Sequence, residues 1–350
     1  MHDSPEDNVA GCETIEAPTE KQPRLRKVGI LGTGSHAPEN ILNNDDLSKM
    51  VETSDSWIIE RTGMQERRIA GEDQAASHLA IAAARAAIDQ AGVKAADIEL
   101  IVVATATPDT LFPATACRVQ QAIGATRAAG FDVAAACAGF VNALMTADSM
   151  IAAGHFQNAL VIGAEKLSSI TDYTDRNTCI LFGDGAGAVV LGADADGAIL
   201  LDHTIRIDGE GLDLIELPAG GSRQPATAES IATNQHYLKL EGRKVFRFAV
   251  KVICESVTEV LERNGYTIDD LDLLIPHQAN LRIIEAANAK LGIAPDRVAI
   301  NIEKYGNTSA ASIPILLDEL SRDGKLKKGQ LICFVAFGAG LSWGASLLRW

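Results

Sequence analysis

The sequence predicts an α/β fold built from two similar halves, and three observations support this. Hydrophobic residues make up 47% of the 350 residues but aromatic ones only 5%, which is typical of an enzyme packed with Ala, Val, Ile and Leu. Residues 98–104 are apolar except for Glu99 and are predicted to form a strand buried in a sheet. Residues 92–102 recur as residues 265–275 at a constant offset of 173, so that helix end, glycine, aspartate and apolar strand coincide. We therefore predict a duplicated α/β unit; the alternative is chance similarity between two such units.

Charge and apolar patterning exclude several classes of protein. The formal net charge of −15 argues against non-specific binding to nucleic acid or to an anionic membrane. No run of about 18 apolar residues predicts a membrane span, and no basic, apolar leader of the secretory type is present. The six cysteines show no CxxC pair or framework spacing, which predicts reduced thiols and a cytoplasmic location.

The chain divides into a tail and two predicted halves. Residues 1–23 carry six acidic side chains against one lysine, so residues 1–24 are predicted to form a disordered acidic tail and not an organellar transit peptide. We place the N-terminal half at residues 25–198 and the C-terminal half at residues 199–350.

The N-terminal half begins with a predicted strand at residues 27–31. The following residues 32–37 imitate a glycine-rich dinucleotide-binding turn, but Pro38 stands where the phosphate-binding helix should be, so we reject a nucleotide site. A second glycine cluster, residues 183–187, precedes a strand and is predicted to be a turn with close backbone packing. Further strands are predicted at residues 98–104, 130–133, 160–164 and 188–191, and helices at 77–91, 115–123 and 140–151.

In the C-terminal half we predict strands at residues 199–207 and 298–302, a polar loop at 218–234 and a long helix at 242–264.

Cys137 follows a short strand and four small residues, and a helical pattern begins directly after it. We expect it at a strand-to-helix corner, where unpaired N–H groups and the helix dipole lower the pKa of a thiol. The alternative is a buried core cysteine that behaves as a small hydrophobe.

The offset of 173 places Cys137 opposite Ala310, in a second corner of small residues that starts at Asn307. His277 lies just after the repeated strand. Taken singly, His277 is better explained as a hydrogen-bonded loop residue than as a catalyst. Asn307 alone would be interpreted as the N-cap of a helix. Under the duplication, Cys137, His277 and Asn307 all lie at the same end of the sheets, where open α/β sheets place their sites.

These residues carry a resemblance to a known family. Residues 133–140, 276–280 and 306–312 resemble the motifs of beta-ketoacyl-acyl-carrier-protein synthase III, the initiating condensing enzyme of type II fatty acid synthesis. Residues 54–58, 61–63, 66–70, 182–187 and 337–340 match in the same order, so that the resemblance covers residues 27–350. It implies a thiolase-like fold, in which the duplicated halves form five layers, αβαβα.

The resemblance also implies a reaction. Cys137 would take an acyl group from acyl-coenzyme A, and the enzyme would condense it with malonyl-acyl-carrier protein, because a thiolate exchanges readily with a thioester. His277 Nε2–H and the Asn307 amide would stabilise the enolate, and the N–H groups of Cys137 and Ala339 would form the oxyanion hole. No cofactor is expected, since coenzyme A and phosphopantetheine enter as parts of the substrates.

Two positions depart from the family pattern. Ala339 stands between Gly338 and Gly340 where three glycines are frequent, and its N–H remains a donor if its φ is negative. Asn177 follows Arg176 where glycine is frequent.

The resemblance extends to the substrate-binding residues. Trp57 and Arg176 match the pair that sandwiches the coenzyme A adenine, with Arg61 one helical turn after Trp57. Phe112 matches a residue that crosses a homodimer interface and forms the floor of the partner's acyl pocket. The depth of each acyl pocket would be set by Phe112 of the partner chain together with Leu341 and the loop at residues 218–234. The alternatives are a core aromatic for Trp57 and ordinary burial for Phe112.

A carrier protein is acidic, so an acidic enzyme needs a local basic patch to bind it. The candidates are Arg243, Lys244, Arg247 and Lys251 on one predicted helix, and Arg282 after the His277 loop. A solvated helix face is the alternative.

Three other functions compete with this one. Cys, His and Asn occur in the papain order, but the papain-type signature around the cysteine is absent. A non-enzymatic paralogue conflicts with the filled catalytic positions. A related condensing enzyme or acyltransferase that makes a specialised metabolite shares these residues and stays open, as does the length of the acyl chain.

Overall fold

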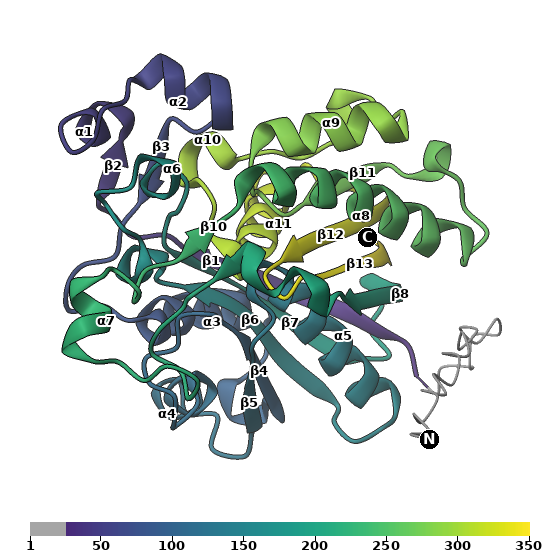
Figure 1. Ribbon diagram of the computed structural model, residues 1–350. Coiled ribbons are helices and arrows are strands. Elements are labelled where there is room, and N and C mark those ends of the chain that lie inside the picture. Colours follow the sequence, from purple (N-terminus) through teal and green to yellow (C-terminus); the bar gives the residue numbers. More distant parts are fainter. Residues whose placement is uncertain (1–25) are drawn as a thin grey trace, which may run out of the picture.

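The structure is a computed structural model that describes residues 26–350 (Figure 1). The predicted acidic tail, residues 1–24, lies outside the described residues. The N-terminal half contains β1 (Val28–His36), β2 (Ile41–Asn43), α1 (Asn44–Ser48), α2 (Asp55–Thr62), β3 (Glu66–Arg68), α3 (Ala76–Ala91), β4 (Leu100–Ala104), α4 (Thr115–Ile123), β5 (Ala129–Val133), α5 (Gly139–Ala152), β6 (Asn158–Glu165), α6 (Arg176–Cys179) and β7 (Gly185–Ala193). The C-terminal half contains β8 (Ala198–Ile207), β9 (Ile215–Glu216), α7 (Ala228–Ala232), β10 (Lys239–Leu240), α8 (Gly242–Glu262), β11 (Leu273–Pro276), α9 (Leu281–Leu291), α10 (Ile302–Tyr305), α11 (Ser312–Arg322), β12 (Leu331–Gly338) and β13 (Ser342–Arg349). Short 3-10 helices lie between them: η1 (Ala95–Asp97), η2 (Ala136–Ala138), η3 (Leu167–Ile170), η4 (Gly209–Leu214), η5 (Ile268–Asp270), η6 (Pro295–Arg297) and η7 (Ser309–Ala311).

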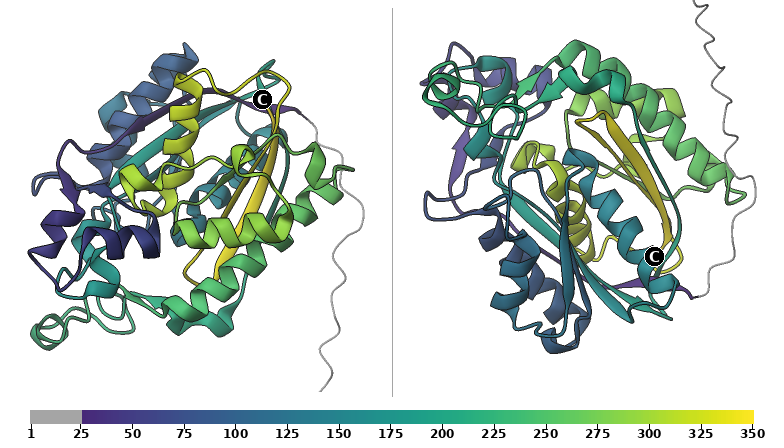
Figure 2. Two further views of the ribbon diagram at one scale, coloured as in Figure 1. Left: turned by 90° about the horizontal axis from the view of Figure 1, so that it is seen from above. Right: turned by 60° about the horizontal axis from the view of Figure 1, so that its bottom comes forward.

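Nine strands form one continuous sheet in the order β11-β12-β13-β8-β1-β7-β6-β4-β5. The two halves of this sheet meet where β1 pairs with β8, through Gly29 with Ile199 and Ile30 with Ala198. Helices α5 and α11 are packed between the halves and are covered on both sides (Figure 2). Helix α3 packs on the outer face of one half, and α8 and α9 pack on the other. The predicted five-layer αβαβα arrangement is therefore present.

The duplication is visible in the element boundaries. β4 and β11, η1 and η5, η2 and η7, α5 and α11, and β6 and β12 each begin 173 residues apart. Both repeated corners contain a non-glycine residue with positive φ, Ala136 at 44° and Ser309 at 49°. The predicted repeat thus relates elements well beyond the stretch that revealed it. The division of the chain at residues 198 and 199, where β8 begins, stays a prediction.

Two predicted elements are wrong. Residues 298–302 form no strand: Val298 pairs with Leu274 in an isolated bridge, and Ile302 begins α10. The second glycine cluster is not a turn, because β7 already starts at Gly185. The close backbone packing predicted for this cluster is confirmed, because a Cβ on Gly187 would lie 2.6 Å from the backbone N of Ile315 in α11. The strand predicted at residues 188–191 is therefore present but starts earlier, at Gly185. The sequence pattern missed this start because close helix–strand contact selects the small residues that also mark turns.

The first glycine-rich stretch is no nucleotide-binding turn either, as expected. Residues 32–36 continue β1 as a strand that pairs with β7 along its whole length. Among residues 26–350, no helix is both long and apolar enough to cross a membrane.

Candidate active site

Cys137 lies in η2, a single turn that connects β5 to α5. The predicted strand-to-helix corner is therefore confirmed, although α5 itself begins two residues later, at Gly139. The second corner, η7, packs against it: a Cβ built on Gly139 would lie 3.5 Å from the Cβ of Ala310. The duplication thus brings together two corners that lie far apart in the sequence.

The predicted effect of this corner on the Cys137 thiol is wrong. Cys137 is half-buried as a residue, but its sulfur is enclosed, and burial raises the pKa of the thiol to about 12. The nearby Ser309 side chain lowers the pKa of the thiol and opposes this effect only in part. Desolvation is the largest influence on this pKa, so the thiol is neutral at physiological pH.

His277 follows β11 and is almost fully buried, with 2% of its surface exposed. Burial lowers the pKa of its imidazole to about 3, so the ring is neutral at physiological pH. Its Nδ1 lies 2.7 Å from Ser312 Oγ, whereas its Nε2 has no hydrogen-bond partner among residues 26–350. A buried imidazole with one fixed and one vacant nitrogen is suited to bind a substrate oxygen.

The His277 ring also connects to the Cys137 corner. It packs edge-on against Phe337 with a centroid distance of 5.7 Å. The next residue, Gly338, ends β12 against the nucleophile: a Cβ there would lie 2.7 Å from the Cys137 backbone N. Only glycine fits this position, because any side chain would push β12 away from Cys137.

Asn307 is held by three bonds that leave one edge of its amide available. Its N–H donates to the Leu181 carbonyl at 2.8 Å, and its carbonyl accepts from Gly183 N–H at 3.0 Å. Its side-chain Oδ1 accepts from Ser309 N–H at 2.8 Å, which leaves the Nδ2 hydrogens as donors. The side chain is 7% exposed, so these donors lie in a largely dry environment.

Ala339 directly follows Gly338 at the end of β12. It is not among the described non-glycine residues with positive φ, so the condition under which its N–H remains usable is met. The bend after it is held by Ser342, whose Oγ donates to the Ala339 carbonyl at 2.9 Å. The peptide bond between Gly340 and Leu341 is cis.

Comparison with known proteins now identifies the family. The family description 3-oxoacyl-(acyl-carrier-protein) synthase III matches residues 131–209, and the description of its C-terminal part matches residues 261–350. The chain is 53% identical over 322 residues to the beta-ketoacyl-(acyl-carrier-protein) synthase III of Caldanaerobacter subterraneus subsp. tengcongensis, which covers 92% of this chain and 97% of that protein. The chain belongs to the beta-ketoacyl-acyl-carrier-protein synthase III family.

Solved structures agree with this assignment. The 3-oxoacyl-(acyl-carrier-protein) synthase III of Aquifex aeolicus is 46% identical, with a TM-score of 0.85 over 92% of this chain and all of that one. The priming beta-ketosynthase of the R1128 polyketide pathway is 36% identical, with a TM-score of 0.86 over 95% of this chain and 99% of that one. The expected thiolase-like fold and the expected class are thus confirmed: the synthase is a condensing enzyme of the acyltransferase type that initiates fatty acid synthesis.

Trp57, Arg61 and Arg176 come together at one end of the synthase. Ser54 caps α2 by accepting from the backbone N–H of Trp57 at 3.2 Å, which fixes the start of the helix that carries the indole. The guanidinium carbons of Arg61 and Arg176 lie 4.6 and 4.9 Å from the Trp57 ring centroid. An adenine between Trp57 and Arg176 needs two stacking distances, about 7 Å, so Arg176 must move outward to admit one. The adenine site therefore stays a prediction.

Phe112 and Leu341 have opposite environments. Phe112 is 84% exposed, so ordinary burial within its own chain is excluded for it. Leu341 is buried against η4: a Cβ on Gly211 would lie 2.6 Å from its Cγ. The loop 218–234 contains a helix, α7, that was not predicted.

The five predicted carrier-binding residues are all exposed. Four lie along α8, and Arg282 is at the start of α9. Lys251 is 3.9 Å from Glu255, so part of its charge is compensated. Exposure is compatible both with carrier binding and with a solvated face.

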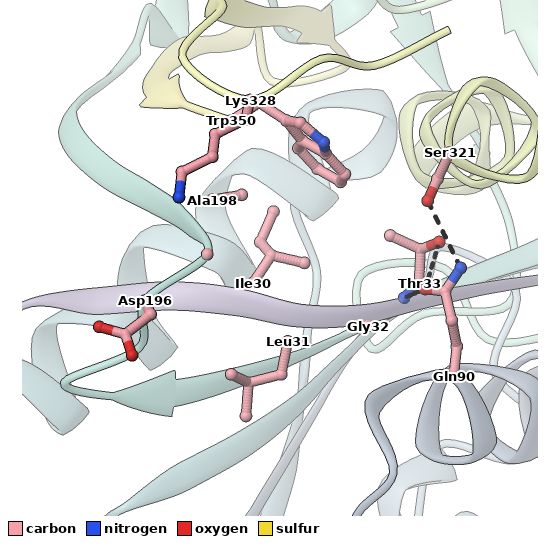
Figure 3. Close-up of a pocket in the computed structure, with 11 residues that line it drawn as sticks. Ile30, Leu31, Gly32, Thr33, Gln90, Asp196, Ala198, Ser321, Lys328 and Trp350 are labelled. Carbon is pink, nitrogen blue, oxygen red and sulfur yellow. Dashed lines mark hydrogen bonds between the residues drawn. The ribbon is translucent and has the colours of Figure 1, made fainter. Parts of the chain in front are cut away.

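A separate cavity of about 340 Å³ lies where β1 approaches the start of β8, beside the C-terminal Trp350. Gln90, Thr33 and Ser321 form a hydrogen-bonded cluster at one end of it, and Asp196 and Lys328 lie toward the other (Figure 3). None of the residues that line it is a predicted site residue. It is distinct from the Cys137 site.

The sequence-based prediction missed two side chains that support the site. Ser312 binds His277, and Glu165 at the end of β6 accepts hydrogen bonds from the loop after β4. The offset of 173 contained a signal for both. Ser312 is the counterpart of Gly139, which begins α5, and Glu165 is the counterpart of Gly338, which ends β12 against Cys137.

Proposed function

We propose that this synthase condenses a short acyl-coenzyme A with malonyl-acyl-carrier protein through an acyl-Cys137 intermediate, giving 3-oxoacyl-acyl-carrier protein, CO2 and coenzyme A. The observation that carries this proposal is the vacant Nε2 of the buried, neutral His277, whose ring packs on the strand end that touches Cys137. Such a donor suits an enolate oxygen and leaves no cation to be neutralised in the site.

In the first step, Cys137 Sγ attacks the thioester carbonyl of acyl-coenzyme A. The bond between the carbonyl carbon and the coenzyme A sulfur breaks, and the Cys137 proton passes to that sulfur. No net base is needed, which fits a thiol whose pKa is raised. The N–H groups of Cys137 and Ala339 would stabilise the tetrahedral oxyanion, each such donor contributing about 3 to 4 kcal/mol.

In the second step, the malonyl thioester loses CO2, and its carbonyl oxygen becomes an enolate oxygen. His277 Nε2–H and Asn307 Nδ2–H donate to this oxygen, and the enolate carbon attacks acyl-Cys137. The bond between the acyl carbon and Cys137 Sγ then breaks, and the thiolate takes a proton from solvent. Cys137, His277 and Asn307 thus form the proposed triad.

The substrates are the proposed partners, and no cofactor is required. Trp57, Arg61 and Arg176 would hold coenzyme A, while Arg243, Lys244, Arg247, Lys251 and Arg282 would bind the acidic carrier protein. We place the synthase in the cytoplasm because the five described cysteines are all free thiols.

We also propose a homodimer. β5 ends the nine-stranded sheet, and its first two residues, Ala129 and Gly130, are exposed (Figure 1). Leu111 and Phe112 expose more than four-fifths of their surface on the loop after β4, the strand that pairs with β5. An unpaired sheet edge next to large exposed apolar side chains favours pairing with a second chain. There Phe112 would reach the partner's acyl pocket beside Leu341.

The decisive experiment measures the mass of the protein after incubation with acyl-coenzyme A. One acyl group should be added, and peptide mapping should place it on Cys137. Cys137→Ala should prevent the addition, whereas Cys117→Ala, which removes an exposed thiol, should not. Acylation that persists in Cys137→Ala would disprove the proposed nucleophile.

A second function, priming of a specialised pathway, is favoured by the similarity to the R1128 priming ketosynthase. The two functions differ in their primer and acceptor. A survey of acetyl, branched and longer acyl-coenzyme A compounds, each with malonyl-carrier protein and with malonyl-coenzyme A, separates them.

A further inference from the structure

Arg67 in β3 is a fully buried arginine to which the proposed reaction gives no role. Its Nη1 donates to the Leu42 carbonyl at 3.1 Å and to Asn44 Oδ1 at 2.9 Å. Its Nη2 donates to the Ile180 carbonyl at 2.8 Å. Its Nε has no hydrogen-bond partner among residues 26–350. The guanidinium is thus held by neutral oxygens that come from three separate segments of the chain.

No described carboxylate forms a hydrogen bond or an ion pair with the Arg67 guanidinium. Glu66, the acidic residue beside it in the chain, pairs with Arg68 at 3.0 Å. Burial lowers the pKa of Arg67 to about 10, so the side chain still carries its charge at physiological pH. A buried cation without a carboxylate destabilises the folded state unless its hydrogen bonds compensate. What these bonds hold in place therefore calls for an explanation.

The Ile180 carbonyl that Arg67 binds belongs to the segment that pairs with Asn307. The carbonyl of the next residue, Leu181, accepts from Asn307 N–H at 2.8 Å, and Gly183 N–H donates to the Asn307 carbonyl at 3.0 Å. These two bonds form an isolated parallel bridge. Arg67 is therefore one hydrogen bond and one peptide unit away from the backbone partner of Asn307.

The stem of Arg67 also packs between the two segments that form this bridge. A Cβ on Gly183 would lie 3.1 Å from the Arg67 Cβ, and a Cβ on Gly306, which precedes Asn307, would lie 3.4 Å from it. β3 is bonded to α10 as well, because Gln65 N–H donates to the Glu303 carbonyl at 3.1 Å (Figure 1). Both sides of the Asn307 bridge thus rest on β3.

We propose that Arg67 is a positioning residue for Asn307, which fixes the amide of the enolate site by binding the Ile180 carbonyl. The planar fork of a guanidinium can reach the Leu42 and Ile180 carbonyls at once, so one side chain ties β2 to the segment opposite Asn307. Without this tie the segment shifts, and Asn307 shifts with it because two hydrogen bonds join them. Misplacement by about 1 Å costs about 10²-fold in rate. This inference rests on the proposed role of Asn307.

A second branch of the same network leads to the coenzyme A residues. Asn44, which accepts from Arg67, donates to Asp55 Oδ1 at 2.8 Å, and Asp55 begins α2, the helix that carries Trp57. Loss of this branch would weaken the binding of acyl-coenzyme A. Saturating acyl-coenzyme A removes that effect from a measured rate, so kinetics can separate the two branches.

The test compares two half-reactions at saturating substrate: release of CO2 from labelled malonyl-carrier protein, and acylation of Cys137 by acyl-coenzyme A. Arg67→Lys keeps the charge but replaces the fork with a single ammonium group. Arg67→Met keeps an apolar stem and buries no charge. In both variants decarboxylation should fall about tenfold or more, whereas acylation should fall by less than about threefold. The retained acylation also shows that the variant is folded.

Arg297→Lys is the matched control. Arg297 also donates to two backbone carbonyls, those of Ile268 and Leu271. These carbonyls precede β11, whereas His277 follows it, so the control lies at the opposite end of that strand from the site. Arg297→Lys should therefore leave the ratio of the two half-reactions unchanged.

The Asn307→Ala background tests whether Arg67 acts through Asn307. Once that amide is gone, Arg67→Lys should change decarboxylation by less than about twofold. An effect as large as in the unmodified protein would overturn the inference, as would equal losses in both half-reactions or full decarboxylation in both Arg67 variants. Arg67→Met takes the place of Arg67→Lys in this comparison if the lysine variant does not fold. Failure of the proposed function would show separately, as decarboxylation that Asn307→Ala alone leaves unchanged.

Discussion

His277 Nδ1 and Ser312 Oγ lie 2.7 Å apart, and both side chains are buried. The backbone N–H of Gln278 donates to the same oxygen at 3.4 Å, which directs the serine hydrogen toward Nδ1. The imidazole hydrogen then resides on Nε2, the tautomer that can donate to an enolate oxygen. A residue 35 positions away thus sets the chemical role of the histidine.

Replacing Ser312 by Ala should therefore slow malonyl decarboxylation. Loss of one orienting hydrogen bond, about 1.4 kcal/mol, corresponds to about a tenfold decrease in rate. Ser312→Thr keeps the hydroxyl and should retain most of the activity. Decarboxylation by Ser312→Ala at the unmodified rate would contradict the tautomer assignment.

Asn307→Ala should separate the two half-reactions. The amide is proposed to donate to the enolate only, so decarboxylation should fall by about 10²- to 10³-fold while acylation of Cys137 falls far less. Release of CO2 from labelled malonyl-carrier protein and the mass of the acyl-enzyme measure the two steps. Asn177→Ala, at an exposed position, should alter neither. Equal losses in both steps would defeat this division of roles.

Arg247→Glu should raise the KM for malonyl-carrier protein by about fivefold or more and leave acyl-coenzyme A kinetics unchanged. Reversing one charge in a complementary interface costs about 1 kcal/mol or more. Steady-state kinetics with each substrate varied in turn provide the measurement. Lys94→Glu makes the same charge change at an exposed position away from α8 and serves as the control. An unchanged KM would place the carrier elsewhere.

Phe112→Glu should convert the proposed dimer to a monomer, because it introduces a charge at a side chain that a partner must bury. Sedimentation velocity at micromolar concentration gives the molecular mass. Met50→Glu, at another exposed apolar residue, should leave the mass unchanged. A dimer that persists in Phe112→Glu would exclude this loop from the interface.

Acidification should destabilise the fold through His277. The pKa of the folded state is about 3, below the ordinary 6.5, so between these values the unfolded chain binds a proton that the folded chain does not. The contribution of the neutral His277 imidazole to the free energy of unfolding is complete above pH 6.5 and is lost as the pH falls toward 3. Urea unfolding at several pH values should show a smaller acid-induced loss for His277→Gln than for the unmodified protein. Parallel stability curves would contradict the burial of a neutral imidazole.

Local patterns were sufficient to locate most elements. The helix predicted at residues 115–123 has those bounds, and the one predicted at 77–91 begins a single residue earlier. The spacing of apolar residues is set within a single helix or strand, so the sequence alone is sufficient to predict the bounds of such elements. The first residues of β7 and the conformation of residues 298–302 were not predicted. Contact with α11 and with β11, and not local periodicity, decides their conformation.

The sequence by itself determined the duplicated architecture, the corner that holds Cys137 and the pairing of that corner with the one at Asn307. Repeated spacing carries this information, since equal spacing in two copies of one unit places equivalent residues at equivalent points. Only the tertiary structure decided the chemical state of those residues. The raised pKa of Cys137, the neutrality of His277 and the hydrogen bonds of Ser312 and Glu165 all depend on segments distant in the chain. Desolvation and hydrogen bonding are set by whatever surrounds an atom in space, and no local pattern specifies those surroundings.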